Sequence, residues 1–220
     1  MAEPIKIDFV SDISCPWCII GLCGLEAALE RTADLVSAEI HFHPFELNPM
    51  MGKGGESVAD HIARKYGSTL EQSAATRLML RERAAEVGFT MNTSSESRIY
   101  NSFDAHRLLH WAGVEGGGRQ QALEHALFAA YFTDQRDPSD HDVLIDAAAT
   151  AGLDRAAAAE VLASGRYAEE VRQAEHHWQG RGVHSVPAIV INDRYLISGG
   201  QPPDAFEQAL RSIAAELADA

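Results

Sequence analysis

A CPWC motif at residues 15–18 stands between a strand pattern and a helix pattern near the start of the chain. Before it, residues 5–10 alternate apolar and polar side chains with the period of a strand. After it, residues 16–30 have a helical period, and Pro16 suits the first helical position because the amide there has no partner within the helix. Cys15 is therefore predicted at the N-cap, where the helix dipole and unpaired amides favour a thiolate.

This placement predicts redox chemistry for the two cysteines of the motif. Cys15 is the expected nucleophile, and Cys18 follows three residues later on the same helix, close enough to close a reversible disulfide. Half of a zinc site and a pair of inert thiols are the alternatives. A closed zinc site needs four ligands, usually from two such motifs, and the sequence has no second cysteine pair. We therefore expect no metal and no cofactor.

The third cysteine, Cys23, is expected to play a different part. At five residues beyond Cys18 it is displaced by about 7.5 Å along the helix and about 140° around it. A Cys18–Cys23 disulfide would require the helix to unwind. We interpret Cys23 as a small buried helix residue, with a redox-regulatory thiol as the alternative.

The rest of the chain predicts a second strand, a long helical stretch and a return to strands. Residues 38–45 alternate in the strand pattern, whereas residues 46–180 are divided into helix-length pieces by glycines and prolines. The strand pattern returns at residues 186–191, and residues 194–198 can pair back as a hairpin. An amphipathic helix over residues 206–217 closes the chain.

This order predicts an α/β, thioredoxin-like fold with a large all-helical insertion. A short strand–helix–strand crossover gives a right-handed parallel unit, and the later hairpin adds an antiparallel edge. We predict a thioredoxin-like domain from residues 1–45 and 181–220, and a helical insertion domain from residues 46–180.

Composition excludes several classes of function. The 220 residues are 46% hydrophobic, which is too apolar for intrinsic disorder. The formal net charge of −14 repels phosphate backbones and anionic lipid surfaces, so nucleic-acid and membrane partners are not expected. Residues 1–10 lack the features of an export signal, so we expect a cytoplasmic location, where clustered cysteines are usually catalytic or metal-binding.

Pro187 stands at the head of the second strand region. Because proline cannot donate to a sheet ladder, it is confined to an edge or to a strand start, and the residues alone leave a cis or a trans peptide bond open.

Together with the CPWC motif, this proline makes the chain resemble the DsbA-like branch of thiol-disulfide oxidoreductases, and most closely its FrnE-like group. The resemblance rests on five segments: FVSDISCPWC at 9–18, PFELNP at 44–49, NSFDAHRL at 101–108, GVHSVPAIVIN at 182–192 and SGGQPPDAF at 198–206.

The resemblance implies roles for individual residues. Cys15 and Cys18 would be the redox pair, and a cis Val186–Pro187 bond would pack over it, with the backbone before the proline pairing with an incoming peptide. Trp17 and, more weakly, His106 join Val186 and Pro187 as expected substrate contacts.

The chain also departs from the family pattern. Pro-Trp replaces the Pro-His found between the cysteines of exported oxidants, so a histidine that favours the thiolate is missing. Ser185 stands where glycine is frequent, and Ala188 where threonine or an aromatic residue is frequent. These departures leave the oxidising strength and the shape of the substrate groove open.

Several other polar residues have two interpretations. Asp12 is either a proton acceptor for Cys18 or a turn residue. His106 and His110 have a spacing that can hold a metal but are more often simply half-buried. The resemblance implies that Arg107 and His106 are weak candidates for facing the cleft. His184 is either a group that assists formation of the thiolate or, as expected, a histidine in a solvated loop.

The leading hypothesis is thiol-disulfide exchange between the Cys15–Cys18 pair and protein or small-molecule thiols and disulfides, glutathione among them. Its direction is not readable from the sequence. The first alternative is a glutathione-dependent isomerase or transferase of the 2-hydroxychromene-2-carboxylate isomerase or kappa-class type. The second is a non-catalytic, chaperone-like peptide binder.

Overall fold

The computed structural model describes residues 2–52 and 54–218. Its elements in chain order are β1 (Glu3–Ser11), α1 (Pro16–Arg31), β2 (Val36–Pro44), β3 (Glu56–Ser57), α2 (Val58–Tyr66), α3 (Leu70–Glu86), β4 (Arg98–Ile99), α4 (Phe103–Glu115), α5 (Arg119–Phe128), a π-helical turn (Ala129–Thr133), α6 (His141–Thr150), α7 (Arg155–Ser164), α8 (Ala168–Gly180), β5 (Ala188–Ile191), β6 (Tyr195–Ser198) and α9 (Pro203–Ala218). Over these described ranges, no helix is both long and apolar enough to cross a membrane.

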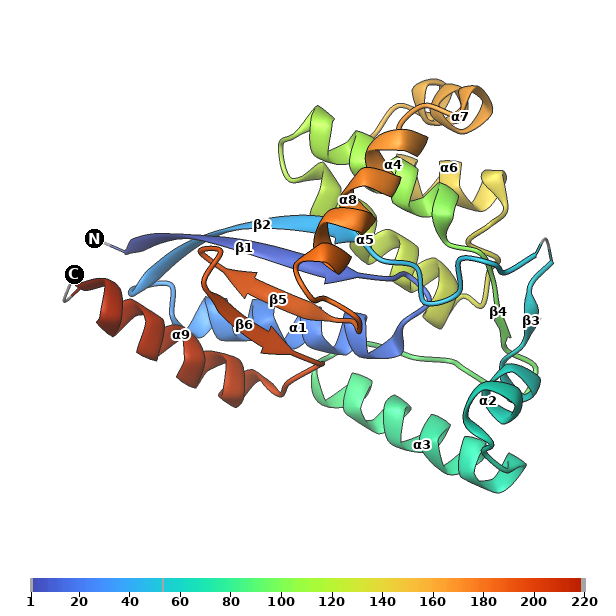
Figure 1. The fold of residues 1–220 in the computed structure, drawn as a ribbon, viewed down its shortest axis with the longest axis horizontal. Coiled ribbons are helices and arrows are strands. Elements are labelled where there is room, and N and C mark those ends of the chain that lie inside the picture. Colours follow the sequence, from blue (N-terminus) through green and yellow to red (C-terminus); the bar gives the residue numbers. More distant parts are fainter. Residues whose placement is uncertain (1, 53, 219–220) are drawn as a thin grey trace.

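A four-stranded sheet in the order β2-β1-β5-β6 forms the centre of the fold (Figure 1). Strand β1 pairs with β2 in parallel, with Phe9 opposite Phe42. It pairs with β5 in antiparallel fashion, where Phe9 lies opposite Ile189, and β5 and β6 form a hairpin. The predicted parallel unit with an antiparallel edge is therefore confirmed.

Both faces of the sheet are covered, because successive side chains of a strand point to opposite faces. Ile7 and Phe9 belong to the large hydrophobic cluster that also contains residues of α1 and α9. Val10 belongs to a second cluster, in which Trp178 of α8 packs with Val190 of β5. Figure 1 shows α1 and α9 beside the sheet, with α8 crossing it, α4 and α5 next to β2, and α6 and α7 packed on α4 and α5.

The β5–β6 hairpin turns at Asn192 and Asp193, as predicted. Both residues have a positive φ, 51° and 57°, as a type I′ turn requires, and Asn and Asp tolerate this conformation better than other side chains. Asn192 also accepts a hydrogen bond through Oδ1 from the amide of Lys6 on β1 (2.9 Å). The turn is therefore tied to the neighbouring strand.

The structure agrees with the predicted α/β fold class. Two features differ from the elements that the sequence periodicity predicts. Strand β5 begins at Ala188 rather than at Val186, because Pro187 has no amide to donate to the ladder. Residues 46–180 are mostly helical but also contain the two-residue ladder of β3 and β4, which is too short to show a strand period. The division into two domains stays a prediction.

Candidate active site

The two cysteines of the motif lie at the start of α1, where β1 gives way to the helix. Cys15 is the N-cap residue, with extended backbone angles, and Pro16 occupies the first turn. The amide of Cys15 donates to the carbonyl of Asp12 (2.9 Å), and the amide of Cys18 donates to the carbonyl of Cys15 (3.0 Å). The Cys15 side chain forms no hydrogen bond to an amide of the helix.

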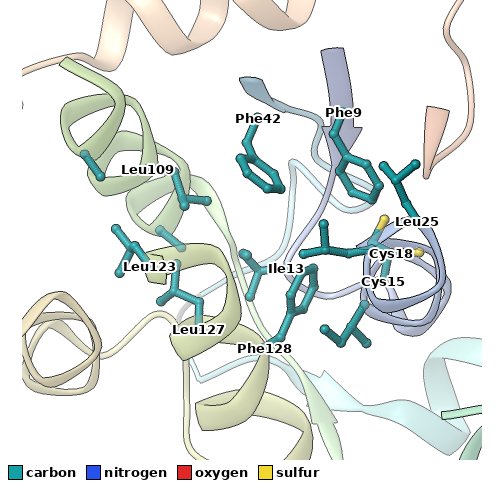
Figure 2. Packing of buried hydrophobic residues seen from close by; sticks show 14 of the residues in the cluster. Phe9, Ile13, Cys15, Cys18, Leu25, Phe42, Leu109, Leu123, Leu127 and Phe128 are labelled. Atoms are coloured by element: carbon teal, nitrogen blue, oxygen red, sulfur yellow. The ribbon is translucent and has the colours of Figure 1, made fainter. Parts of the chain in front are cut away.

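The two thiols differ in their access to solvent. They are free and lie 3.4 Å apart, within the hydrophobic cluster that includes Phe9, Ile13 and Leu25 (Figure 2). Cys15 is 4% exposed and Cys18 is completely buried, so only Cys15 can be reached from outside. Burial, together with the neighbouring Cys15, raises the pKa of the Cys18 thiol well above its usual range.

The segment before β5 lies against Cys15. The Cys15 thiol donates to the carbonyl oxygen of Val186 (3.6 Å), and the Val186–Pro187 peptide bond is cis. Val186 is half-buried, and Pro187 is buried. The backbone of Val186 is thus placed beside the reactive sulfur.

Glycines allow α1 to approach this segment closely. A Cβ at Gly21 would lie 3.2 Å from the Pro187 ring, and a Cβ at Gly200 would lie 2.7 Å from the carbonyl oxygen of Trp17. The half-buried Trp17 ring also lies against Gly200, 3.2 Å from that same Cβ position. Gly200 therefore supports both Trp17 and the helix that carries the cysteines.

Asp12 forms a buried polar group next to the cysteines. Its Oδ1 accepts from the amide of Ser14 (2.9 Å), its Oδ2 accepts from the amide of Leu47 (2.6 Å), and Oδ1 lies 3.8 Å from Nε2 of His106. Burial acts to raise the pKa of Asp12, but His106 and the two amides overcome it and the net pKa is lowered. Asp12 thus holds the turn before Cys15 and remains ionised beside Cys18.

His106 of α4 is buried next to Asp12. Its Nε2 lies 3.2 Å from the carbonyl oxygen of Phe45, and only 2% of the residue is exposed. Burial acts to lower the pKa of His106, but Asp12 outweighs burial and the net pKa is raised. The expected substrate contact of His106 stays a prediction, because the observed partners of its ring are protein groups.

A second buried carboxyl, Glu124 of α5, lies at the end of β1. The Ser11 hydroxyl donates to its Oε1 (2.7 Å), and within the described residues its Oε2 has no hydrogen-bond partner. Burial raises the pKa of Glu124 to about 7, against the smaller opposing effects of Ser11 and His106. Glu124 therefore changes its charge near neutral pH.

These groups border a cavity of about 440 Å³ between β2 and the helices. Its lining includes Ser11, His43, His106, His110 and Glu124. The cavity thus connects the buried polar groups behind the cysteines with histidines nearer the surface.

The remaining candidate site residues, Arg107, His110 and His184, have different surroundings in the structure. Arg107 is buried and donates to the carbonyl oxygens of Arg166 (2.8 Å) and Val161, so it links α4 to α7. His110 lies beside the Tyr167 ring, and His184 is exposed. In the part of the chain that the structure describes, neither His106 nor His110 belongs to a group of three metal-ligating side chains.

Sequence reasoning recognised Asp12 but missed the other buried acidic groups, which are Asp8, Glu46, Glu124 and Glu175. Glu124 was not recognised, although it interrupts the apolar stripe formed by Leu123 and Leu127. Glu46 is also buried, where Arg172 bonds to it and to Glu175 (2.8 Å). Arg172 and Glu175 are neighbours on α8, but Glu46 lies 126 residues from Arg172 and Glu124 lies 113 residues from Ser11, so no local pattern could have shown the contacts of Glu46 and Glu124.

Comparison with known proteins gives one family. A family model described as a DSBA-like thioredoxin domain matches residues 6–211. The chain is 27% identical over 207 residues to the uncharacterized protein YwbO of Bacillus subtilis, covering 94% of this chain and 96% of that protein.

Solved structures are also similar. A probable DsbA oxidoreductase from Streptomyces coelicolor is 34% identical, with a TM-score of 0.88 over 94% of this chain and 89% of that one. A 2-hydroxychromene-2-carboxylate isomerase has a TM-score of 0.72 at 18% identity, over 97% of this chain and 98% of that one. The second likeness concerns the fold alone.

Proposed function

The chain belongs to the family of DSBA-like thioredoxin domains, and on that premise we propose that it exchanges disulfides through Cys15 and Cys18 with protein or small-molecule thiols. The observation that carries the proposal is the placement of a slightly exposed Cys15 at the N-cap of α1, 3.4 Å from a fully buried Cys18. Glutathione is included among the small thiols. The FrnE-like group and a cytoplasmic location stay predictions.

The geometry supports an ordered reaction. The Cys15 thiolate attacks one sulfur of a substrate disulfide, so that a Cys15–substrate disulfide forms and the other substrate sulfur leaves as a thiolate. Cys18 then passes its proton to the substrate thiolate released in the first step and attacks the Cys15 sulfur. The Cys15–Cys18 disulfide forms, and the second substrate thiol is released. Two electrons pass from the protein to the substrate, and the reverse sequence oxidises substrate thiols.

The raised pKa of Cys18 supports this division of labour. Before attack, Cys18 remains protonated because burial and the neighbouring sulfur disfavour its thiolate. Cys15 meets the substrate first because it is the more exposed of the two.

Trp17, Val186 and Pro187 supply the proposed substrate contacts. The Val186 carbonyl already lies beside the Cys15 sulfur, where it can pair with the amide of an extended peptide. Trp17 is half-buried at the same end of α1 and offers an apolar surface next to the cysteines.

Insulin reduction by a reductant-coupled assay tests the proposal. The Cys15→Ser variant should fall to the rate of the buffer control, and Cys18→Ser should lose multiple turnovers because it cannot resolve the mixed disulfide. Cys23→Ser is the matched control, since it removes a thiol of the same helix and should retain the rate. Full activity in Cys15→Ser would refute the proposal.

The glutathione-dependent isomerase is the second candidate, because the isomerase structure shares this fold. A dithiol pair has no use in that reaction, which needs only one residue to activate the glutathione thiol. Isomerase turnover that requires glutathione and survives in the Cys18→Ser variant would favour this candidate over disulfide exchange. Suppression of client aggregation by a Cys15→Ser/Cys18→Ser variant that lacks both activities would instead favour the chaperone-like binder.

A further inference from the structure

Cys23 has neighbours that the redox proposal does not use. It lies on α1, and Glu26 follows three residues later on the same helix. His125 approaches from α5. One potential ligand atom of each residue, the Cys23 sulfur, a Glu26 oxygen and a His125 ring nitrogen, lies within 4.8 Å of the other two.

The three side chains are held in place but remain reachable. Nε2 of His125 lies 2.7 Å from Oε1 of Glu26, and Nε2 of Gln121 donates to the same oxygen (2.5 Å). The side chains of His125 and Glu26 are 36% and 25% exposed, and Cys23 is half-buried. The group is therefore partly ordered before any ligand arrives and is open to solvent.

We propose that Cys23, Glu26 and His125 form a binding site for a divalent transition-metal ion, with Zn²⁺ as the expected occupant. Thiolate, imidazole and carboxylate are the ligand types that Zn²⁺ takes in proteins, and three such ligands leave a fourth tetrahedral position for water. The net charge of −14 adds a long-range attraction for cations.

The observed distances fit this ion after a small adjustment. Metal–nitrogen and metal–oxygen bonds of about 2.0–2.1 Å at a tetrahedral angle separate the two ligand atoms by about 3.3 Å. His125 and Glu26 therefore need to open by a few tenths of an ångström from their present hydrogen bond. Gln121 can keep its bond to Glu26 and so orient the carboxylate from outside the coordination sphere.

Thiolate is the form of cysteine that binds a metal ion. Binding of a divalent ion would therefore displace the proton of the Cys23 thiol into solvent.

The site would tie α1 to α5. Such a link joins the helix that carries the redox pair to a helix from the 46–180 stretch. It would also hold the Cys23 sulfur in a coordination bond.

Titration with Co²⁺, a spectroscopic substitute for Zn²⁺, tests the site in the full-length Cys15→Ser/Cys18→Ser variant, which removes the dithiol as a competing ligand. We expect one Co²⁺ per chain, a thiolate-to-cobalt charge-transfer band and the intense visible bands of a tetrahedral ion. Adding Cys23→Ser should abolish the charge-transfer band, and adding His125→Gln should weaken binding about tenfold or more. The matched control is His184→Gln, which removes an exposed histidine outside the group and should leave the titration unchanged.

Circular dichroism of each variant separates loss of binding from loss of the fold. Absence of stoichiometric Co²⁺ binding in the folded double variant would overturn the proposal. So would a charge-transfer band that persists when Cys23 is replaced. A rise in the Zn²⁺-dependent melting temperature that disappears in Cys23→Ser would support the site independently of any absorption band.

Discussion

The thiol of Cys15 donates to the carbonyl oxygen of Val186 at 3.6 Å, although 171 residues separate them in the sequence. The contact joins the start of α1 to the segment that leads into β5. It brings Cys15, the less buried cysteine of the redox pair, beside the backbone of Val186, which precedes the first residue of β5. A disulfide-bearing peptide that reaches Cys15 would therefore meet the Val186 carbonyl at the same time.

Gly200 packs tightly against α1, which carries Cys15, so we predict that Gly200→Ala destabilises the protein. The new Cβ would lie 2.7 Å from the Trp17 carbonyl oxygen and 3.3 Å from the Gly21 amide nitrogen, so backbone must move. Overpacking of this kind costs about 1–3 kcal/mol in the free energy of unfolding, measurable by urea denaturation.

Gly180→Ala is the matched control for that substitution. Its Cβ meets no described atom within 4 Å, and Gly180 lies at the end of α8 without a positive φ. We expect a change within about 1 kcal/mol. Equal destabilisation by both substitutions would show that Gly200 has no special packing role.

The raised pKa of Glu124 predicts that the Glu124→Gln substitution changes the stability of the protein in a pH-dependent way. The folded-state pKa of about 7 lies above the usual 4.5, so the folded protein binds more protons than the unfolded chain between these values, and this group's contribution to stability falls as pH rises. Glutamine keeps the acceptor for Ser11 without the charge. Relative to wild type, the variant should therefore gain stability between pH 5 and pH 8, by an amount on the order of 3 kcal/mol or less.

Unfolding free energies at the two pH values measure this gain. The exposed Glu82→Gln substitution serves as the control and should show no comparable gain. A Glu124→Gln variant whose stability relative to wild type is the same at both pH values would contradict a buried carboxyl that titrates near neutrality.

The Asp12–His106 pair predicts an energetic coupling that an exposed pair lacks. A double-mutant cycle with Asp12→Asn and His106→Gln should give a coupling of about 1 kcal/mol or more, because both side chains are buried. The exposed Arg83–Glu86 pair, at 3.0 Å, provides the control and should give less than about 0.5 kcal/mol.

The sign of the pH dependence follows from the directions of the two pKa shifts. The lowered pKa of Asp12 means that its contribution is present above the usual 3.8 and is lost at lower pH. The raised pKa of His106 means that its contribution is full below the usual 6.5 and is lost as pH rises through the folded value. The coupling should thus be largest near pH 5–6 and smaller at pH 9. Equal coupling energies near pH 5–6 and at pH 9 would show that Asp12 and His106 do not interact as a charged pair.

Local patterns were sufficient to predict the elements that carry the cysteines. The alternation before Cys15 and the proline after it placed the end of β1 and the start of α1 correctly. The Asn192-Asp193 turn likewise placed the hairpin, because its residues suit the positive φ values that the turn needs.

The surroundings of the cysteines could not be predicted in the same way. Ser11 meets Glu124 across 113 residues, where α5 packs against the end of β1. Leu47 meets Asp12 across 35 residues, where the ends of the paired strands β1 and β2 lie side by side. Both bonds therefore depend on tertiary structure rather than on local spacing. Sequence reasoning left Asp12 as either a proton acceptor for Cys18 or a turn residue. The structure shows the turn contact, since its carboxylate accepts from the amide of Ser14 while it is fully buried, and the proton-acceptor role stays a prediction.

Trapping of a mixed disulfide tests the central claim most directly. The Cys18→Ser variant, incubated with disulfide-bonded insulin or oxidised glutathione and analysed by peptide mass mapping, should carry one adduct, on Cys15. The resolving thiol is absent, so the adduct should accumulate, whereas wild type should instead form the Cys15–Cys18 disulfide. A variant that remains unmodified, or that carries its adduct on Cys23 instead, would contradict Cys15 as the attacking thiol.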